Sequence, residues 1–163
     1  MDFDITSLRD NQAKAMCLFT SLNNRIKLLS QKLLYNQVNL HLDQAERLLE
    51  MVFGGEYQHT IQFMKLNFLR KEALCKRMSR NKAKWLVQTQ ALVKNSLQIA
   101  DAIFPNSYYK ARALVHRGDI ELEEKEGDKA AQTYLDAQIM ITALYGSDHP
   151  MIIYFNAAII DAK

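Results

Sequence analysis

Three segments of the chain share one pattern of apolar residues, and each segment ends at an aromatic residue, Phe53, Phe104 or Tyr145. Counting back from the ring, apolar residues stand one, five and eleven positions earlier, and a small residue stands eight positions earlier. The small residues are Ala45, Ser96 and Ala137. Side chains separated by three, four, seven or eight positions lie on one face of an α-helix. The pattern therefore predicts three helices, each with a buried stripe that runs up to the aromatic residue.

Each of these segments is followed by a short polar break and then by a new apolar-periodic run. Ten positions after each ring stands a further large apolar residue, namely Phe63, Leu114 or Phe155. In the third break, Gly146 can adopt the left-handed conformation that closes a helix, and Ser147 or Asp148 can cap the next helix. Pro150 suits the first turn of that helix, where no backbone donor is needed. The breaks thus predict tight turns between antiparallel helices.

The composition agrees with an all-α fold. The 163 residues include only five Gly and two Pro, and strong helix formers such as Leu, Ala, Lys and Glu are plentiful. The predicted helices span about 7–35, 39–53, 58–78, 82–104, 107–124, 128–145 and 150 to the end. The aromatic residues are 51 and then 41 residues apart, a period that is typical of stacked helix hairpins. With 48% apolar residues, 1–163 can form a single helical-repeat domain.

Two stretches of the sequence carry opposite charge. From Lys65 to Lys84 there are eight basic residues against the single acid Glu72, whereas 119–128 holds six acids and one base. The basic residues that cluster at a predicted turn are Lys76, Arg77, Arg80, Lys82 and Lys84. They could contact an acidic protein surface or nucleic-acid phosphates, although charged turns are commonly only solvated. We expect the acidic stretch to form a solvated helix end and turn.

The sequence contains no motif for catalysis or for binding a metal or cofactor. Phosphate-binding Gly-rich loops, a nucleophile elbow and histidine pairs at helical metal-ligand spacing are all missing. Cys17 and Cys75 fit neither a disulfide framework nor a metal motif, so we predict buried thiols in a reducing compartment. There is no secretory signal and no apolar run of about 18 residues. We therefore expect a cytoplasmic protein that is not an enzyme and does not enter a membrane.

The segment from Leu114 to Ala137 resembles the tetratricopeptide repeat. Five residues match the spacing of that pattern: Leu114, Gly118, Ala130, Tyr134 and Ala137. Gly118 and Ala130 would let helix backbones approach closely, while the large side chains would fill the space between helices. Arg117 and Glu121 depart from the pattern, because leucine and tyrosine are usual at those positions. The resemblance implies antiparallel helix hairpins stacked as a solenoid.

The stretch 143–150 is similar to the longer repeat of kinesin light chain, in which a helix ends in a Gly-x-Asp-His-Pro turn. In that family an asparagine follows in the next helix and lines a concave groove that holds extended peptides. Asn156 falls at this position, so the resemblance implies that Asn156 contacts a partner. The equivalent positions of earlier hairpins are the apolar Met64 and Val115. The close resemblance covers about 107–163.

These observations favour a protein–protein interaction module that binds a partner peptide or helix on a concave face, built from the first helix of each hairpin. One alternative is a structural scaffold subunit of a cytoskeletal, ciliary or ribonucleoprotein assembly, which uses its charged turns. Another is direct binding of nucleic acid through 65–84. The apolar face of the last run, with Ile152, Phe155 and Ile159, predicts that the array continues past Lys163.

Overall fold

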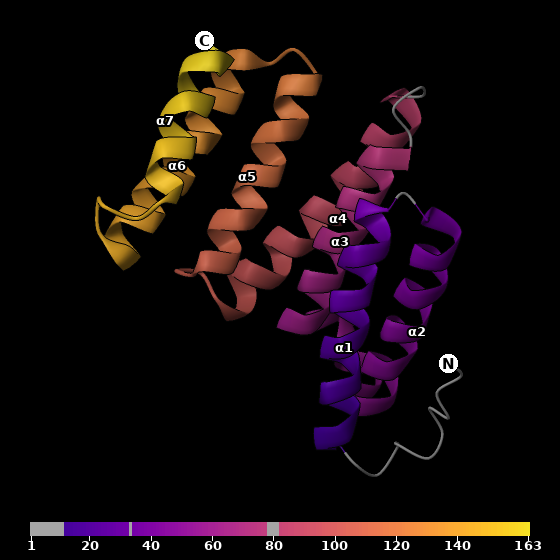
Figure 1. The fold of residues 1–163 in the computed structure, drawn as a ribbon. Coiled ribbons are helices and arrows are strands. Elements are labelled where there is room, and N and C mark those ends of the chain that lie inside the picture. The colour runs from indigo at the N-terminus through magenta and orange to yellow at the C-terminus, as the bar shows by residue number, and fades with distance from the viewer. Residues whose placement is uncertain (1–11, 33, 78–81) are drawn as a thin grey trace. The chain divides into compact units, whose positions relative to one another are not determined.

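The computed structural model of the protein describes residues 12–32, 34–77 and 82–163, and these residues form helices and turns without a strand. The helices are α1 (Gln12–Gln31), α2 (Tyr35–Phe53), α3 (Ile61–Arg77), α4 (Lys82–Ile103), α5 (Tyr108–Glu123), α6 (Gly127–Tyr145) and α7 (Met151–Ala162) (Figure 1). A 3-10 helix, η2 (Gly54–His59), joins α2 to α3. The all-α prediction is confirmed. The third helix begins at Ile61 rather than at about residue 58 as predicted, because η2 occupies the polar break and the residues just after it.

The chain is divided into two compact units, Met1–Trp85 and Leu86–Lys163. In the first unit, α1 packs on α2 and both contact α3. Its core contains Phe19, Ile26, Leu42, Leu49 and Met64, which recur at helical spacing along these three helices. None of the helices in the described residues is both long and apolar enough to cross a bilayer.

The second unit is a layered packing in which α6 lies against α5 and α7 lies against α6 (Figure 1). Tyr134 of α6 and Phe155 of α7 are fully buried at its centre. Small residues of α5 and α6, namely Ala111, Ala130 and Ala137, join the same core. Because these side chains are short, the neighbouring helices can approach one another closely.

The closest approach in this core is between Gly118 of α5 and the ring of Tyr134. A Cβ atom at Gly118 would lie 2.6 Å from Cε1 of Tyr134, which is well inside van der Waals contact. The phenol of Tyr134 also donates a hydrogen bond to Asp119, with 2.8 Å between Oη and Oδ1. The structure therefore has close packing at Gly118, and it is the Tyr134 ring that makes the contact.

The repeated apolar stripe is buried along most of its length but not at its end. Ala45, Ser96 and Ala137, the small residues of the pattern, each have 0% of their surface exposed. Phe104 and Tyr145 are exposed instead, as are the residues that precede them, Ile103 and Leu144. The prediction that the stripe runs buried up to its ring is wrong for these two helices. At Tyr145 the ring packs on His149, at 5.1 Å between centroids, so it covers the turn rather than the core.

The turn before α7 has the predicted glycine but a different cap. Gly146 has a φ of 87°, a conformation that favours glycine. Neither Ser147 nor Asp148 is the N-cap of the next helix, because α7 begins at Met151 and its N-cap position is Pro150. The Nδ1 atom of His149 accepts the hydrogen bond from the backbone N–H of Met151 at 3.2 Å.

Cysteine burial also differs from the expectation. Cys17 is exposed and Cys75 is half-buried. Ala15, Phe19, Leu22 and Ile26 form the buried face of α1 at spacings of three and four, which turns Cys17 toward solvent. The prediction of a buried thiol at Cys17 is therefore wrong.

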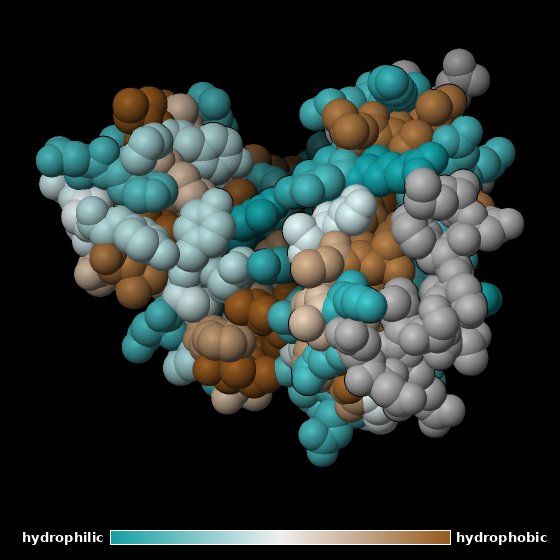
Figure 2. Space-filling model, turned by 60° about the horizontal axis from the view of Figure 1, so that its bottom comes forward, coloured by the Kyte–Doolittle hydropathy of each residue, from teal (hydrophilic) through white to brown (hydrophobic). Residues whose placement is uncertain are grey.

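Apolar side chains also reach the surface in several places. On the face drawn in Figure 2, apolar patches interrupt a largely hydrophilic surface. The most exposed large apolar residues include Val87 of α4, Ile139 of α6, and Ile153 and Ile160 of α7. Scattered exposure of this kind is ordinary, but three of these residues are isoleucines on the two adjacent helices α6 and α7. Exposed apolar groups of this kind can contact another protein.

We expect Gly118→Ala to lower the free energy of unfolding by about 1–3 kcal/mol, because the added methyl group would overlap the Tyr134 ring. Chemical denaturation followed by circular dichroism would measure the change. Gly55→Ala is the matched control, since a Cβ atom there meets nothing within 4 Å. An unchanged stability for Gly118→Ala would show that the ring does not rest on the α5 backbone.

Alkaline pH should destabilise the protein through the buried phenol of Tyr134. Burial raises the pKa of Tyr134 above its ordinary value of 10.0, and the Asp119 carboxylate raises it further. Tyr154 is 47% exposed, and its pKa is raised by partial burial and by the same carboxylate. Above pH 10 the phenol of Tyr134 therefore stays protonated in the folded state but ionises in the unfolded state. The stability that the Tyr134 phenol contributes is fully present below pH 10 and falls above it, by up to about 1.4 kcal/mol per pH unit.

This alkaline effect can be measured by denaturation at a series of pH values, together with the ultraviolet absorbance of phenolate. Tyr134→Phe should flatten the decline above pH 10, because that phenol no longer ionises on unfolding. A decline of unchanged steepness in this variant would contradict the assignment to Tyr134.

Candidate functional site

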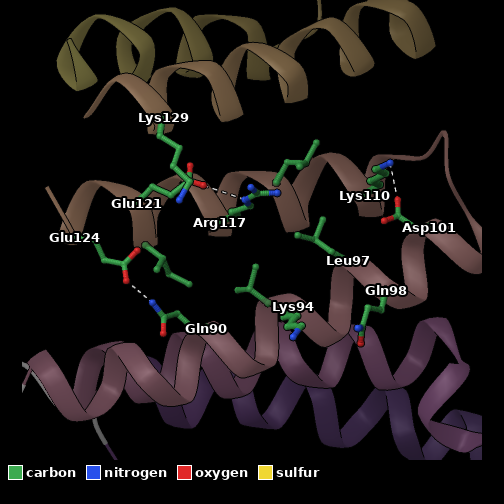
Figure 3. Close-up of a pocket in the computed structure, with 13 residues that line it drawn as sticks. Gln90, Lys94, Leu97, Gln98, Asp101, Lys110, Arg117, Glu121, Glu124 and Lys129 are labelled. Atoms are coloured by element: carbon green, nitrogen blue, oxygen red, sulfur yellow. Dashed lines mark hydrogen bonds and ion pairs between the residues drawn. The ribbon is translucent and has the colours of Figure 1, made fainter. Parts of the chain in front are cut away.

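A groove lies between α4 and α5, wholly within the second unit (Figure 3). It encloses a cavity of about 550 Å³. The apolar residues that line it are Val93 and Leu97 of α4 together with Leu114 and Ile120 of α5. Polar and charged side chains surround this floor. The groove thus combines an apolar base with a charged rim, as ligand-binding clefts commonly do.

Two side-chain contacts join the helices at the two ends of the groove (Figure 3). At one end the amide of Gln90 donates a hydrogen bond to the carboxylate of Glu124. At the other end Lys110 forms an ion pair with Asp101, with 2.6 Å between Nζ and Oδ1. Between these two contacts, no hydrogen bond or ion pair between the side chains drawn in Figure 3 crosses the groove, and its apolar floor is accessible.

The α5 side of the groove is organised by a buried carboxylate. Glu121 is only 3% exposed and accepts two hydrogen bonds, from Nε of Arg117 at 2.9 Å and from Oγ1 of Thr133 at 2.6 Å. A buried carboxylate is costly unless it is paired and hydrogen-bonded, and here it is both. Arg117 and Glu121 are the two residues that depart from the tetratricopeptide pattern. They pair with each other, so the charge of the buried Glu121 is balanced by Arg117.

The burial of Glu121 corrects the expectation for the acidic stretch, which was a solvated helix end and turn. Asp119 is half-buried and binds Tyr134, and Glu121 is inside the packing. The later acids, such as Glu123 and Glu124, are exposed as expected. A run of acids looks solvated in sequence because partners from the next helix, such as Thr133, cannot be seen there.

The α4 side of the groove carries a row of three polar side chains, Gln90, Lys94 and Gln98. They are spaced by four residues and lie along the same edge of the helix (Figure 3). Lys94 and Gln98 are exposed, and neither has a hydrogen-bond or ion-pair partner among the residues that the structure describes. Two groups of this row are therefore available to an occupant of the groove.

Lys129 completes the charged rim near the start of α6. Its ammonium group contacts Glu126 at 2.7 Å, and this hydrogen bond and the negative charge raise its pKa. Lys129 is thus held as a cation beside the groove but is already paired with a carboxylate.

Asn156, the predicted groove residue, lies elsewhere. It is exposed on α7, and its Oδ1 accepts a hydrogen bond from the amide of Gln138 on α6 at 2.7 Å. It does not line the α4–α5 groove. Of the equivalent positions, Met64 is fully buried in the first unit and Val115 is half-buried. A role for Asn156 in partner binding stays a prediction.

The predicted basic cluster falls almost entirely outside the described residues. Arg80 lies outside the described residues, and so do the side chains of Lys76, Arg77 and Lys82. Lys84 is exposed at the start of α4. Binding of an acidic surface or of nucleic acid by this cluster stays a prediction.

Sequence reasoning missed the groove residues of α4. Their spacing is visible in the sequence, but polar residues at every fourth position occur on many exposed helix faces. What makes the row a site is that α5 lies opposite it, and the sequence does not show which face of α4 meets α5. Within the described ranges, no group of three or more His, Cys, Asp or Glu could hold a metal ion.

Comparison of the chain with protein-family models, curated proteins and solved structures finds no significant match.

Thr133→Val should lower the free energy of unfolding by about 1–3 kcal/mol, because it removes a hydrogen bond from the buried Glu121 carboxylate without changing side-chain shape. Thr142→Val is the control, since Thr142 is exposed on the same helix. Thermal or chemical denaturation of both variants would test this. Equal stabilities would mean that Glu121 does not depend on Thr133.

Proposed function

We propose that this chain is a non-enzymatic protein-binding module, in which the α4–α5 groove receives a segment of a partner protein. The proposal rests on one observation: an open groove of about 550 Å³ with an apolar floor and unpartnered polar groups on its α4 rim. Recognition surfaces commonly combine apolar contacts at the centre with polar contacts at the edge. The Lys110–Asp101 ion pair and the Gln90–Glu124 hydrogen bond join the two sides of the groove and so hold its shape.

At the level of architecture, we propose that the helices are stacked hairpins of the tetratricopeptide kind. The five matching residues supply the support, since Leu114, Ala130, Tyr134 and Ala137 are buried and Gly118 is covered by a ring. In such an arrangement α5 and α6 form one hairpin, and α7 begins the next. Grooves between successive helices are then a regular product of the stacking.

A structural role in a larger assembly is a second candidate, favoured by the exposed isoleucines of α6 and α7. Ile139, Ile153 and Ile160 are 59%, 78% and 73% exposed. Replacing Ile153 and Ile160 by Asp should leave the fold intact and abolish any co-purification that depends on this face. Co-purification that survives the double substitution would count against this role.

The groove function can be tested by selecting peptides from a random library on the wild-type protein and measuring their affinity for two variants. Gln98→Trp places a large ring over the groove and should weaken every groove-bound peptide at least about tenfold. Gln88→Trp is the matched control, because Gln88 is exposed on α4 and does not line the groove. Circular dichroism would verify that both variants fold.

Selected peptides that lose affinity equally for both variants, or for neither, would show that binding does not occur in the groove. In that case the proposed function is wrong, even if the peptides bind the protein elsewhere.

A further inference from the structure

We propose that the occupant of the α4–α5 groove is an extended, acidic peptide segment, one carboxylate of which pairs with Lys94. This inference rests on the proposed function, because it names the chemistry of the segment that the groove would bind. Three features of the groove carry it: the distance between its end contacts, the spacing of its polar row, and its unpaired charge.

The two contacts that join α4 to α5 set the length of the open floor. Their α4 members, Gln90 and Asp101, are separated by eleven positions in the chain. At a rise of about 1.5 Å per residue this corresponds to roughly 16 Å along the helix. An extended chain advances about 3.3 Å per residue, so roughly five residues fit between the contacts.

The polar row on α4 matches the repeat of an extended chain. Gln90, Lys94 and Gln98 follow one another every four residues, which is roughly 6 Å along the helix axis. An extended peptide presents equivalent main-chain groups on one side every two residues, or roughly 6.6 Å. Side-chain amides can both donate to and accept from such groups. A helical segment would offer this row no main-chain partners, because its interior main-chain groups are already hydrogen-bonded.

The charge on the groove favours an acidic occupant. Three of its four cations already contact a carboxylate: Lys110 with Asp101, Arg117 with Glu121, and Lys129 with Glu126. Lys94 is the fourth, and it has no such partner in the part of the chain that the structure describes. Glu124, which could attract a basic occupant, already accepts a hydrogen bond from Gln90. A carboxylate placed near Lys94 would therefore satisfy the one cation of the groove that lacks an acid.

The floor adds a preference for alternation. Successive side chains of an extended chain point to opposite sides. Apolar side chains directed at Leu97 and Leu114 would leave the intervening acidic side chains near the rim, where Lys94 lies. The expected sequence thus alternates apolar and acidic residues over about five positions.

The test uses three synthetic peptides and measures their binding by fluorescence anisotropy. The first alternates Glu with Val and Leu, the second replaces each Glu by Lys, and the third holds the acidic composition in a covalently stapled helix. The first peptide should bind, and the second and third should bind at least about tenfold more weakly. Added salt should weaken the binding of the first peptide.

Variants of the protein assign the effect to Lys94. Lys94→Glu should weaken the first peptide at least about tenfold, because like charges would then face each other. Lys94→Met, which removes only the ion pair, should weaken it about two- to five-fold. Lys27→Glu is the control for net charge, since Lys27 is an exposed lysine on α1 and does not line the groove. It should change the affinity less than about twofold, which is the size of effect that the weakest surface ion pairs have.

The possible outcomes separate this inference from the proposed function. Equal effects of Lys94→Glu and Lys27→Glu would overturn the inference. So would library peptides that are sensitive to Gln98→Trp but prove basic or helical, although the groove would then still be a binding site. Failure of all peptides to depend on Gln98→Trp would overturn both.

Discussion

The lack of a side chain at Gly118 lets the ring of Tyr134 lie directly against the α5 backbone, and the second unit is arranged around that contact. A Cβ atom there would lie 2.6 Å from the ring, so α5 and α6 could not approach as they do. The same tyrosine donates a hydrogen bond to Asp119, and the neighbouring α7 contributes Tyr154, whose pKa the same carboxylate raises. One glycine and one carboxylate thereby link three successive helices.

The position of α5 determines the groove. With its inner face against Tyr134, α5 turns Leu114, Arg117, Ile120 and Glu121 toward α4, where they line the cavity. Glu121 connects the core of the second unit to the groove, because it accepts a hydrogen bond from Thr133 of α6 and another from Arg117 beside the groove. Core packing and the candidate site are therefore coupled through a single buried carboxylate. A substitution that releases it would alter both stability and the shape of the groove.

The helices could largely be predicted from the sequence, because apolar spacing and turn residues act over a few positions. The predicted ends of α2, α6 and α7 fall within a few residues of the observed ones, and the tetratricopeptide resemblance implied close packing at Gly118. Several expectations about residues whose contacts come from distant parts of the chain were wrong. Tyr145 packs on a turn rather than in the core, Cys17 faces solvent, and Glu121 is buried.

The sequence by itself determined an all-α chain, the approximate limits of its helices, and the small residues that allow close packing. These properties depend on local periodicity and on side-chain size, which are read directly from neighbouring residues. Only the tertiary structure decided that Lys94 and Gln98 border a groove while Asn156 lies on a separate face. The physical reason is that a site is formed by the rotation of one helix against another, and contacts between helices set that rotation.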